Sequence, residues 1–131
     1  LGPDGHSDAD VLIHALMDAM LGAAGLRDIG YYFPPEDDQY KGISSMLLLE
    51  KVNFLLKERG LQAYNIDIMV ISETPKLKPH IDMMKANLQS ILEIPLDRIS
   101  IKATTNEMLG AIGRREGIAA QAVVSVYEGE I

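Results

Sequence analysis

Three segments of the chain carry apolar residues every three to four positions, which is the period of a helix packed on one side. The first extends from Ser7 to Gly25, with Ser7 or Asp8 as the expected N-cap. Gly22 or Gly25 is the expected stop. The expected buried residues of this helix are Val11, Leu12, Ala15, Leu16, Ala19, Met20 and Ala23.

Two further helices follow the same pattern. Ser44 caps the second, which Gly60 ends, and the third extends from Pro79 or His80 to Leu92. Proline is tolerated at the first turn because that turn has free N–H groups in any case. The expected buried face of the second helix consists of Leu47, Leu48, Val52, Leu55 and Leu56.

Runs rich in β-branched residues predict three strands, at Asn65–Ile71, Arg98–Thr104 and Ile118–Tyr127. Arg27–Gly42 is rich in glycine, proline and acidic residues and is expected to form an ordered, functional loop. Asn106–Gly117 is expected to form a loop or a broken short helix. Helices that alternate with strands predict a layered α/β or α+β domain.

The composition and charge of the chain exclude several classes of protein. A length of 131 residues suits one domain, and 47% hydrophobic residues indicate a globular protein. The absence of cysteine excludes disulfides and thiolate metal ligands, and no apolar stretch is long enough to cross a membrane. A formal net charge of −7 argues against general binding of nucleic acid, but backbone donors and metals can still hold a small anionic ligand.

Asp10, His14 and Asp18 are spaced four residues apart on the polar side of the first helix. One imidazole with carboxylates suits zinc or another divalent metal. A solvated helix face has the same appearance, so both interpretations remain open.

Several other groups could bind phosphate. His6 and Ser7 stand at the expected helix start, where they could hold an anion or simply cap the helix. Lys102–Glu107 follows a strand and could cradle a phosphoryl group beside a metal, or could be an ordinary strand end. Lys76 could meet a phosphate or face water, and Asp28 and Asp37 could bind a polyol, a metal or solvent.

Gly113–Glu116 could form an interface salt bridge or contact an anion. The chain contains no Walker-type glycine loop, no G-x-S-x-G elbow and no H-E-x-x-H motif. Covalent catalysis is therefore disfavoured, and the motifs favour a site that binds phosphate together with a metal.

Taken in order, a set of short motifs resembles the 2-C-methyl-D-erythritol 2,4-cyclodiphosphate synthase family over almost the whole chain. The motifs are His6–Asp10 with His14, Leu21–Ala24, Asp28–Gly30, Phe33–Pro34, Lys41–Gly42, Pro75–Lys76 with Pro79–Ile81, Lys102–Thr105 with Glu107 and Leu109–Gly110, and Gly113–Arg114 with Glu116–Ala119.

The resemblance implies an α+β fold, a layered α/β sandwich with a mixed sheet and helices on one face. It also implies a homotrimer with active sites between subunits. Such enzymes convert 4-diphosphocytidyl-2-C-methyl-D-erythritol 2-phosphate to the 2,4-cyclodiphosphate and release CMP, in the non-mevalonate pathway of isoprenoid biosynthesis. The implied partners are this cytidine diphosphate substrate and further copies of the chain, with no nucleic acid and no membrane.

The resemblance also assigns roles to residues. His14 would bind zinc or another divalent metal, Glu107 would bind magnesium through the diphosphate, and His6 with Thr105 would be catalytic. The implied substrate-binding residues are His6, Ser7, Asp28, Ile29, Gly30, Phe33, Pro34, Pro35, Glu36, Asp37, Ser72, Glu73, Thr74, Pro75, Lys76, Leu77, Lys78, Thr104, Thr105, Asn106, Glu107 and Arg114.

The family's N-terminal Asp-x-His pair of metal ligands does not occur in this chain. We therefore expect residues 1–131 to form one domain that lacks roughly the first two strands of the family. Two alternatives follow, namely an inactive or regulatory trimeric scaffold and the C-terminal part of a bifunctional cytidylyltransferase/cyclodiphosphate synthase. The expected location is the bacterial cytoplasm, or a plastid if a transit peptide preceded the sequence.

Overall fold

A computed structural model describes residues 3–71, 77–104 and 119–129, with residues 3–8 described as backbone. The predicted loop at Asn106–Gly117 lies outside these residues. Each of the three predicted helices and three predicted strands is found. The helices are α1 (Pro3–Ala23), α2 (Ile29–Tyr32), α3 (Ser45–Glu58) and α4 (Ile81–Leu92), the strands are β1 (Leu61–Ile71), β2 (Ile99–Thr104) and β3 (Ala119–Glu128), and the short 3₁₀ turns are η1 (Asp38–Tyr40), η2 (Lys78–His80) and η3 (Leu96–Arg98).

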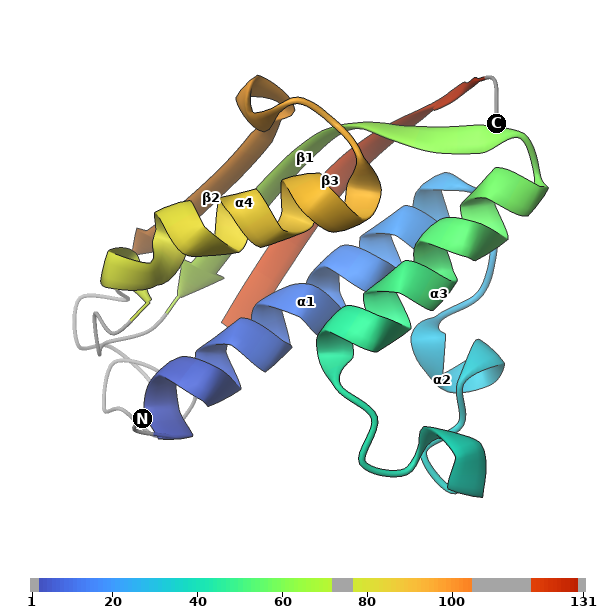
Figure 1. Ribbon diagram of the computed structural model, residues 1–131, viewed down its shortest axis with the longest axis horizontal. Helices are drawn as coiled ribbons and strands as arrows, with labels where there is room; N and C mark the ends of the chain where they lie inside the picture. The colour runs from blue at the N-terminus through green and yellow to red at the C-terminus, as the bar shows by residue number, and fades with distance from the viewer. Residues whose placement is uncertain (1–2, 72–76, 105–118, 130–131) are drawn as a thin grey trace.

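The described strands form a mixed sheet in the order β2-β1-β3, in which β1 is parallel to β2 and antiparallel to β3. The long helices α1, α3 and α4 lie together on one face of this sheet (Figure 1). This arrangement confirms the predicted α+β class with a mixed sheet and helices on one face. The parallel pair is connected through α4, as a parallel connection requires a crossover.

The core lies between the helices and the covered face of the sheet. In β1 the buried residues Ile66, Ile68 and Val70 alternate with more exposed ones, as a strand covered on one side should. The register with β3 shifts between Ala63 and Asn65, where β1 has one extra residue. Ala63 is therefore also buried, although it stands three positions before Ile66. The helices supply the larger part of the buried set, namely Leu12, Ile13, Leu16, Met17, Met20, Leu21, Leu49, Val52, Leu56, Leu88 and Leu92.

Helix α1 starts earlier than the sequence pattern predicts. It begins at Pro3, so Ser7 and Asp8 lie inside the helix and the predicted N-cap is wrong. Proline is well suited to the first helical turn, which accounts for the earlier start. The predicted stop at Gly25 is confirmed, because Gly25 has a φ of +74° and the Leu26 N–H donates to the Leu21 carbonyl at 2.8 Å.

The buried stripes of the helices agree only in part with the prediction: Leu12, Leu16 and Met20 of α1 and Val52 and Leu56 of α3 are buried as predicted. On α1 the core contains Ile13, Met17 and Leu21, whereas Ala23 is exposed. On α3 the buried residues are Leu49, Val52, Asn53 and Leu56. Leu47, which was expected to be buried, is 46% exposed. The direction from which the sheet and the other helices approach decides which apolar residues are covered.

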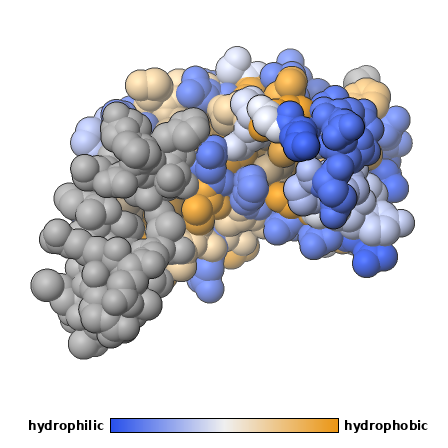
Figure 2. Space-filling view, turned by 90° about the horizontal axis from the view of Figure 1, so that it is seen from below, coloured by the Kyte–Doolittle hydropathy of each residue, from blue (hydrophilic) through white to orange (hydrophobic). Residues whose placement is uncertain are grey.

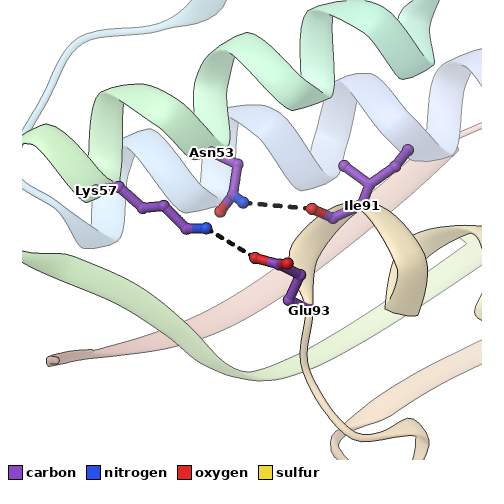
Figure 3. A network of polar contacts seen from close by, with 4 residues as sticks. All are labelled: Asn53, Lys57, Ile91 and Glu93. Atoms are coloured by element: carbon purple, nitrogen blue, oxygen red, sulfur yellow. Dashed lines mark hydrogen bonds and ion pairs between the residues drawn. The ribbon is translucent and has the colours of Figure 1, made fainter. Parts of the chain in front are cut away.

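Polar contacts join α3 to the C-terminal end of α4 (Figure 3). Asn53 is buried, and its Nδ2 donates to the Ile91 carbonyl at 3.4 Å. Lys57 Nζ lies 2.9 Å from Glu93 Oε1. Glu93 ends α4 in the left-handed region at φ 59°, a conformation that costs a non-glycine residue about 1–2 kcal/mol. The contacts from α3 therefore hold a helix end that is intrinsically unfavourable.

The segment predicted as an ordered loop contains α2 and η1, and aromatic contacts run through it. The Arg27 guanidinium lies 4.2 Å from the centre of the Tyr31 ring, and Tyr31 and Tyr32 meet edge to face. Phe33 and Tyr40 meet in the same way, with ring centres 5.2 Å apart. These contacts within the loop give it a defined shape, as expected.

Candidate functional site

The last residues of β1 and β2 and the first residue of β3 lie next to one another at one end of the sheet. Ile71, the last residue of β1, is paired with Thr104, the last residue of β2, and with Ala119, the first residue of β3. The carboxyl ends of neighbouring parallel strands are a common place for ligand binding in open α/β sheets. Two of the predicted binding segments, which begin at Ser72 and at Thr104, therefore start from adjacent points.

The beginning of α1 lies at the same end of the molecule as these strand ends (Figure 1). His6 and Ser7 belong to the backbone of α1 rather than preceding it. His6 and Ser7 therefore do not stand at the helix start, where the sequence predicted that they could hold an anion, because the helix begins at Pro3.

The predicted metal stripe has a different structure from either interpretation of the sequence. The His14 side chain is exposed, but the carboxylates on either side of it bind neighbouring elements. Asp18 Oδ1 accepts a hydrogen bond from the Ile29 N–H at 2.9 Å, and Asp10 Oδ1 accepts one from the Ser45 hydroxyl at 2.5 Å. Sequence reasoning missed these two contacts, whose only signal was the spacing that placed both carboxylates on one helix face.

The described residues do not complete a metal site around His14. Within residues 9–71, 77–104 and 119–129 no three histidine or acidic side chains gather closely enough to hold a metal ion. A closed zinc site needs four ligands, and even a catalytic site needs three from the protein. His14 therefore fits as one ligand, and the described residues do not fit as the whole set.

The two predicted aspartates of the loop cap short helices. Asp28 accepts a hydrogen bond from the Tyr31 N–H at 3.2 Å and so caps α2. Asp37 accepts from the Gln39 N–H at 3.1 Å and from Gln39 Nε2 at 3.2 Å. Capping orders the loop and leaves further lone pairs on each carboxylate for a ligand.

The other predicted residues of this loop surround the two caps. Ile29, Phe33 and Pro34 are half-buried, whereas Gly30, Pro35 and Glu36 are exposed. Hydrophilic side chains gather at this end of the molecule (Figure 2). The loop thus combines exposed polar residues with half-buried apolar ones.

The remaining predicted residues divide into those that the structure describes and those that it does not. Leu77 is buried with 2% exposure, which suits a core role, whereas Lys78 and Thr104 are exposed. Lys102, beside Thr104, lies 2.8 Å from Asp67 Oδ1. Outside the described residues lie Ser72, Glu73, Thr74, Pro75, Lys76, Thr105, Asn106, Glu107 and Arg114.

The structure separates the predicted site into two parts. The strand ends that lead into the 72–78 and 104–107 segments lie at one end of the molecule, and α2 with its loop lies toward the other end (Figure 1). One copy of the chain thus does not bring its described site residues into a single cluster.

A small cavity lies between α1, α3 and α4, beside the Asp10–Ser45 hydrogen bond. Its volume is about 180 Å³, and it is lined by Ala9, Asp10, Ile13, Ser44, Ser45, Met46, Met84 and Asn87.

None of the helices in the described part of the chain has the length and apolar character needed to span a membrane.

Comparisons with known proteins agree with this arrangement. A family model described as the YgbB family matches residues 1–127. The chain is 59% identical over 123 residues to the 2-C-methyl-D-erythritol 2,4-cyclodiphosphate synthase of Synechococcus elongatus, which covers 94% of this chain and 77% of that protein.

Solved structures show the same fold. The bifunctional IspDF of Campylobacter jejuni superposes with a TM-score of 0.83 at 45% identity, over 88% of this chain and 31% of that one. The IspF of Plasmodium falciparum in its CDP complex superposes with a TM-score of 0.79 at 29% identity, over 92% of this chain and 72% of that one. The chain therefore belongs to the YgbB family, in which its curated relatives are 2-C-methyl-D-erythritol 2,4-cyclodiphosphate synthases.

Proposed function

We propose that this chain converts 4-diphosphocytidyl-2-C-methyl-D-erythritol 2-phosphate to 2-C-methyl-D-erythritol 2,4-cyclodiphosphate and CMP. The observation that carries the proposal is 59% identity over 123 residues to a synthase of that name. Identity of this degree over 94% of the chain includes both the helical layer and the strand ends described above.

The reaction is an intramolecular phosphoryl transfer. An oxygen of the 2-phosphate forms a bond to the β-phosphorus of the diphosphate, and the bond from that phosphorus to the CMP oxygen breaks. The enzyme is thus a phosphorus–oxygen lyase. Positioning and neutralisation of charge supply most of the catalysis in such transfers, which agrees with the absence of a nucleophile motif.

The erythritol portion would bind at the α2 loop. Asp28 and Asp37 are held there by their capping hydrogen bonds, and Phe33 supplies an apolar wall. The proposed residues of this subsite are Asp28, Ile29, Gly30, Phe33, Pro34, Pro35, Glu36 and Asp37.

The cytidine and the diphosphate would bind at the strand ends. Residues 72–78 follow β1 and would hold the cytosine and ribose, and Thr104–Glu107 would cradle the diphosphate. His6 and Thr105 would stabilise the transferring group, Ser7 would contact the erythritol phosphate, and Arg114 would lie near the trimer axis. The pairing of Ile71 with Thr104 supports the closeness of the first two segments.

A complete site would require more than one copy of the chain. The α2 loop and the strand ends lie toward opposite ends of one molecule, so a second copy could bring the loop of one to the strand ends of another (Figure 1). This separation supports sites that are shared between subunits, which the proposed homotrimer would provide. Sedimentation that shows a stable monomer at working concentration would contradict this part of the proposal.

The proposed reaction uses two divalent metal ions. His14 would be one ligand of zinc, and Glu107 would bind magnesium through the diphosphate. When bound, such ions neutralise charge on the phosphoryl oxygens. The chain's own contribution at the described residues is the exposed His14 imidazole on a rigid helix.

The proposal is tested by incubating the protein with the substrate, zinc and magnesium. CMP is measured by chromatography and the cyclic product by phosphorus NMR, with a chelator-treated sample as the control. Equal amounts of both products are expected. Absence of CMP at every metal concentration would support an inactive scaffold instead.

A further inference from the structure

The polar stripe of α1 connects to both ends of the long loop that follows it. Asp18 accepts a hydrogen bond from the N–H of Ile29, the first residue of α2. Asp10 accepts one from the hydroxyl of Ser45, the first residue of α3. The chain from Ile29 to Ser45 includes every residue of the proposed erythritol subsite except Asp28, which directly precedes Ile29. Both ends of this segment are therefore attached to one face of one helix.

The Asp18 contact completes the start of α2. The first N–H groups of a helix have no partner inside the helix and need one elsewhere. In α2 the Tyr31 N–H is satisfied by Asp28, and the Ile29 N–H is satisfied by Asp18. The four-residue helix α2 thus has two of its first N–H groups bound by aspartate side chains.

The Asp10 contact anchors the other end of the loop. Ser45 is the first residue of α3, and its neighbour Ser44 caps that helix by accepting a hydrogen bond from the Leu47 N–H. The Ser45 hydroxyl is thus not needed for capping and donates to Asp10 across the helix interface.

His14 lies midway between the two anchors. Eight residues of α-helix rise about 12 Å, so each carboxylate stands about 6 Å along the axis from His14. The side chains at four-residue spacing lie on the same helix face. The loop is therefore held at two points that bracket the exposed imidazole.

We propose that Asp10 and Asp18 are positioning residues that set the distance between the erythritol subsite and His14. This inference rests on the proposed function. It also changes the interpretation of the stripe, because the two carboxylates act as hydrogen-bond acceptors for the loop rather than as metal ligands. At position 18 the contact with the Ile29 N–H then requires an acceptor but no negative charge.

Three variants test the inference. Asp18→Ala removes the acceptor and is expected to raise KM for the substrate with a loss of about tenfold to a hundredfold in kcat/KM, the size expected from a small misplacement. Asp18→Asn keeps an acceptor oxygen and is expected to restore KM to within about threefold of wild type. Ser45→Ala is expected to raise KM in the same direction as Asp18→Ala.

Ser44→Ala is the matched control. It removes a helix cap beside Ser45 and is expected to lower the melting temperature without changing KM. Zinc content and amide hydrogen exchange at Ile29 are measured for every variant. Asp18→Ala is expected to keep wild-type zinc content and to lose protection at the Ile29 amide.

Two results would overturn the inference. If Asp18→Asn is as damaging as Asp18→Ala and both lose zinc, Asp18 is a metal ligand. If Asp18→Ala lowers the melting temperature but leaves KM unchanged, the contact serves folding alone. A wild-type chain that releases no CMP contradicts the proposed function instead, and exchange at the Ile29 amide then decides whether Asp18 holds the loop: unchanged protection in Asp18→Ala overturns it.

Discussion

Lys57 of α3 and Glu93 at the end of α4 form an ion pair in which Nζ and Oε1 lie 2.9 Å apart (Figure 3). The hydrogen bond and the charge of Lys57 hold the pKa of the Glu93 carboxyl below its ordinary value. A group whose pKa is lower in the folded state stabilises the protein above its unfolded pKa, and this stabilisation is lost as pH falls through the folded pKa.

Lys57→Met is therefore expected to destabilise the protein slightly at neutral pH and by less as the solution becomes acidic. Midpoints of urea unfolding for both proteins, measured from neutral pH down through the range in which glutamates titrate, check this. Lys51→Met, on the exposed side of α3, is the control and should show no such pH dependence. A difference between wild type and Lys57→Met that grows toward acidic pH would contradict the assignment.

Asn53 is the one buried polar side chain among the described residues, and it donates to the Ile91 carbonyl. Asn53→Asp keeps the shape but replaces the donor with a carboxylate that faces a carbonyl oxygen. We expect a loss of about 2–4 kcal/mol in the free energy of unfolding, since a buried charge without a partner is costly. The loss should shrink at acidic pH, where the carboxyl is protonated and can donate.

Asn65→Asp is the control for this variant, because Asn65 is exposed on β1 and its charge remains in water. Urea unfolding of both variants gives the comparison. Equal stabilities for Asn53→Asp and Asn65→Asp would show that the contact with Ile91 is unimportant.

Alanine substitutions at Leu56 and at Leu47, compared with each other, test which face of α3 is buried. Leu56→Ala is expected to cost about 2–5 kcal/mol, because it leaves a cavity in the core. Leu47→Ala is expected to change stability by no more than about 0.5 kcal/mol, because that side chain is 46% exposed. Calorimetric melting of both variants measures the difference, and similar costs would mean that α3 packs by its other face.

Two glycines at the end of α1 should respond in opposite directions to alanine. Gly22 lies inside the helix with no atom within 4 Å of an added Cβ, so Gly22→Ala is expected to stabilise the protein by about 0.5–1 kcal/mol. Gly25 has a φ of +74°, so Gly25→Ala is expected to cost about 1 kcal/mol or more. Shifts of the same sign in thermal melting would contradict the helix end described here.

His14→Ala is expected to lower the zinc bound by each chain after dialysis against zinc and then buffer. His80→Ala, which removes the exposed imidazole of η2, is the control and should keep wild-type zinc content. Metal content is measured by atomic absorption, which does not depend on activity. Equal zinc content in both variants would remove His14 from the proposed ligands.

The secondary structure was largely predictable because its signals are local. Gly25 and Gly60 end their helices with positive φ, and Ser44 caps α3, as the sequence alone indicated. The sequence predicts the start of α1 at Ser7 rather than at Pro3, because a serine followed by apolar residues resembles a cap in any context. The sequence predicts the start of β1 at Asn65 rather than at Leu61, because the pairing of Leu61 with Glu128 on β3 is not local.

The class of fold, the family and the residue types of the candidate site can be predicted from the amino-acid sequence, because periodicity, turn residues and short motifs are properties of neighbouring positions. The hydrogen bonds that Asp10 and Asp18 accept from Ser45 and Ile29 follow from the packing of the helices and could not be predicted from the sequence. The packing also decides which face of α3 is buried. These contacts join residues far apart in the chain, and their partners depend on how the helices pack on the sheet.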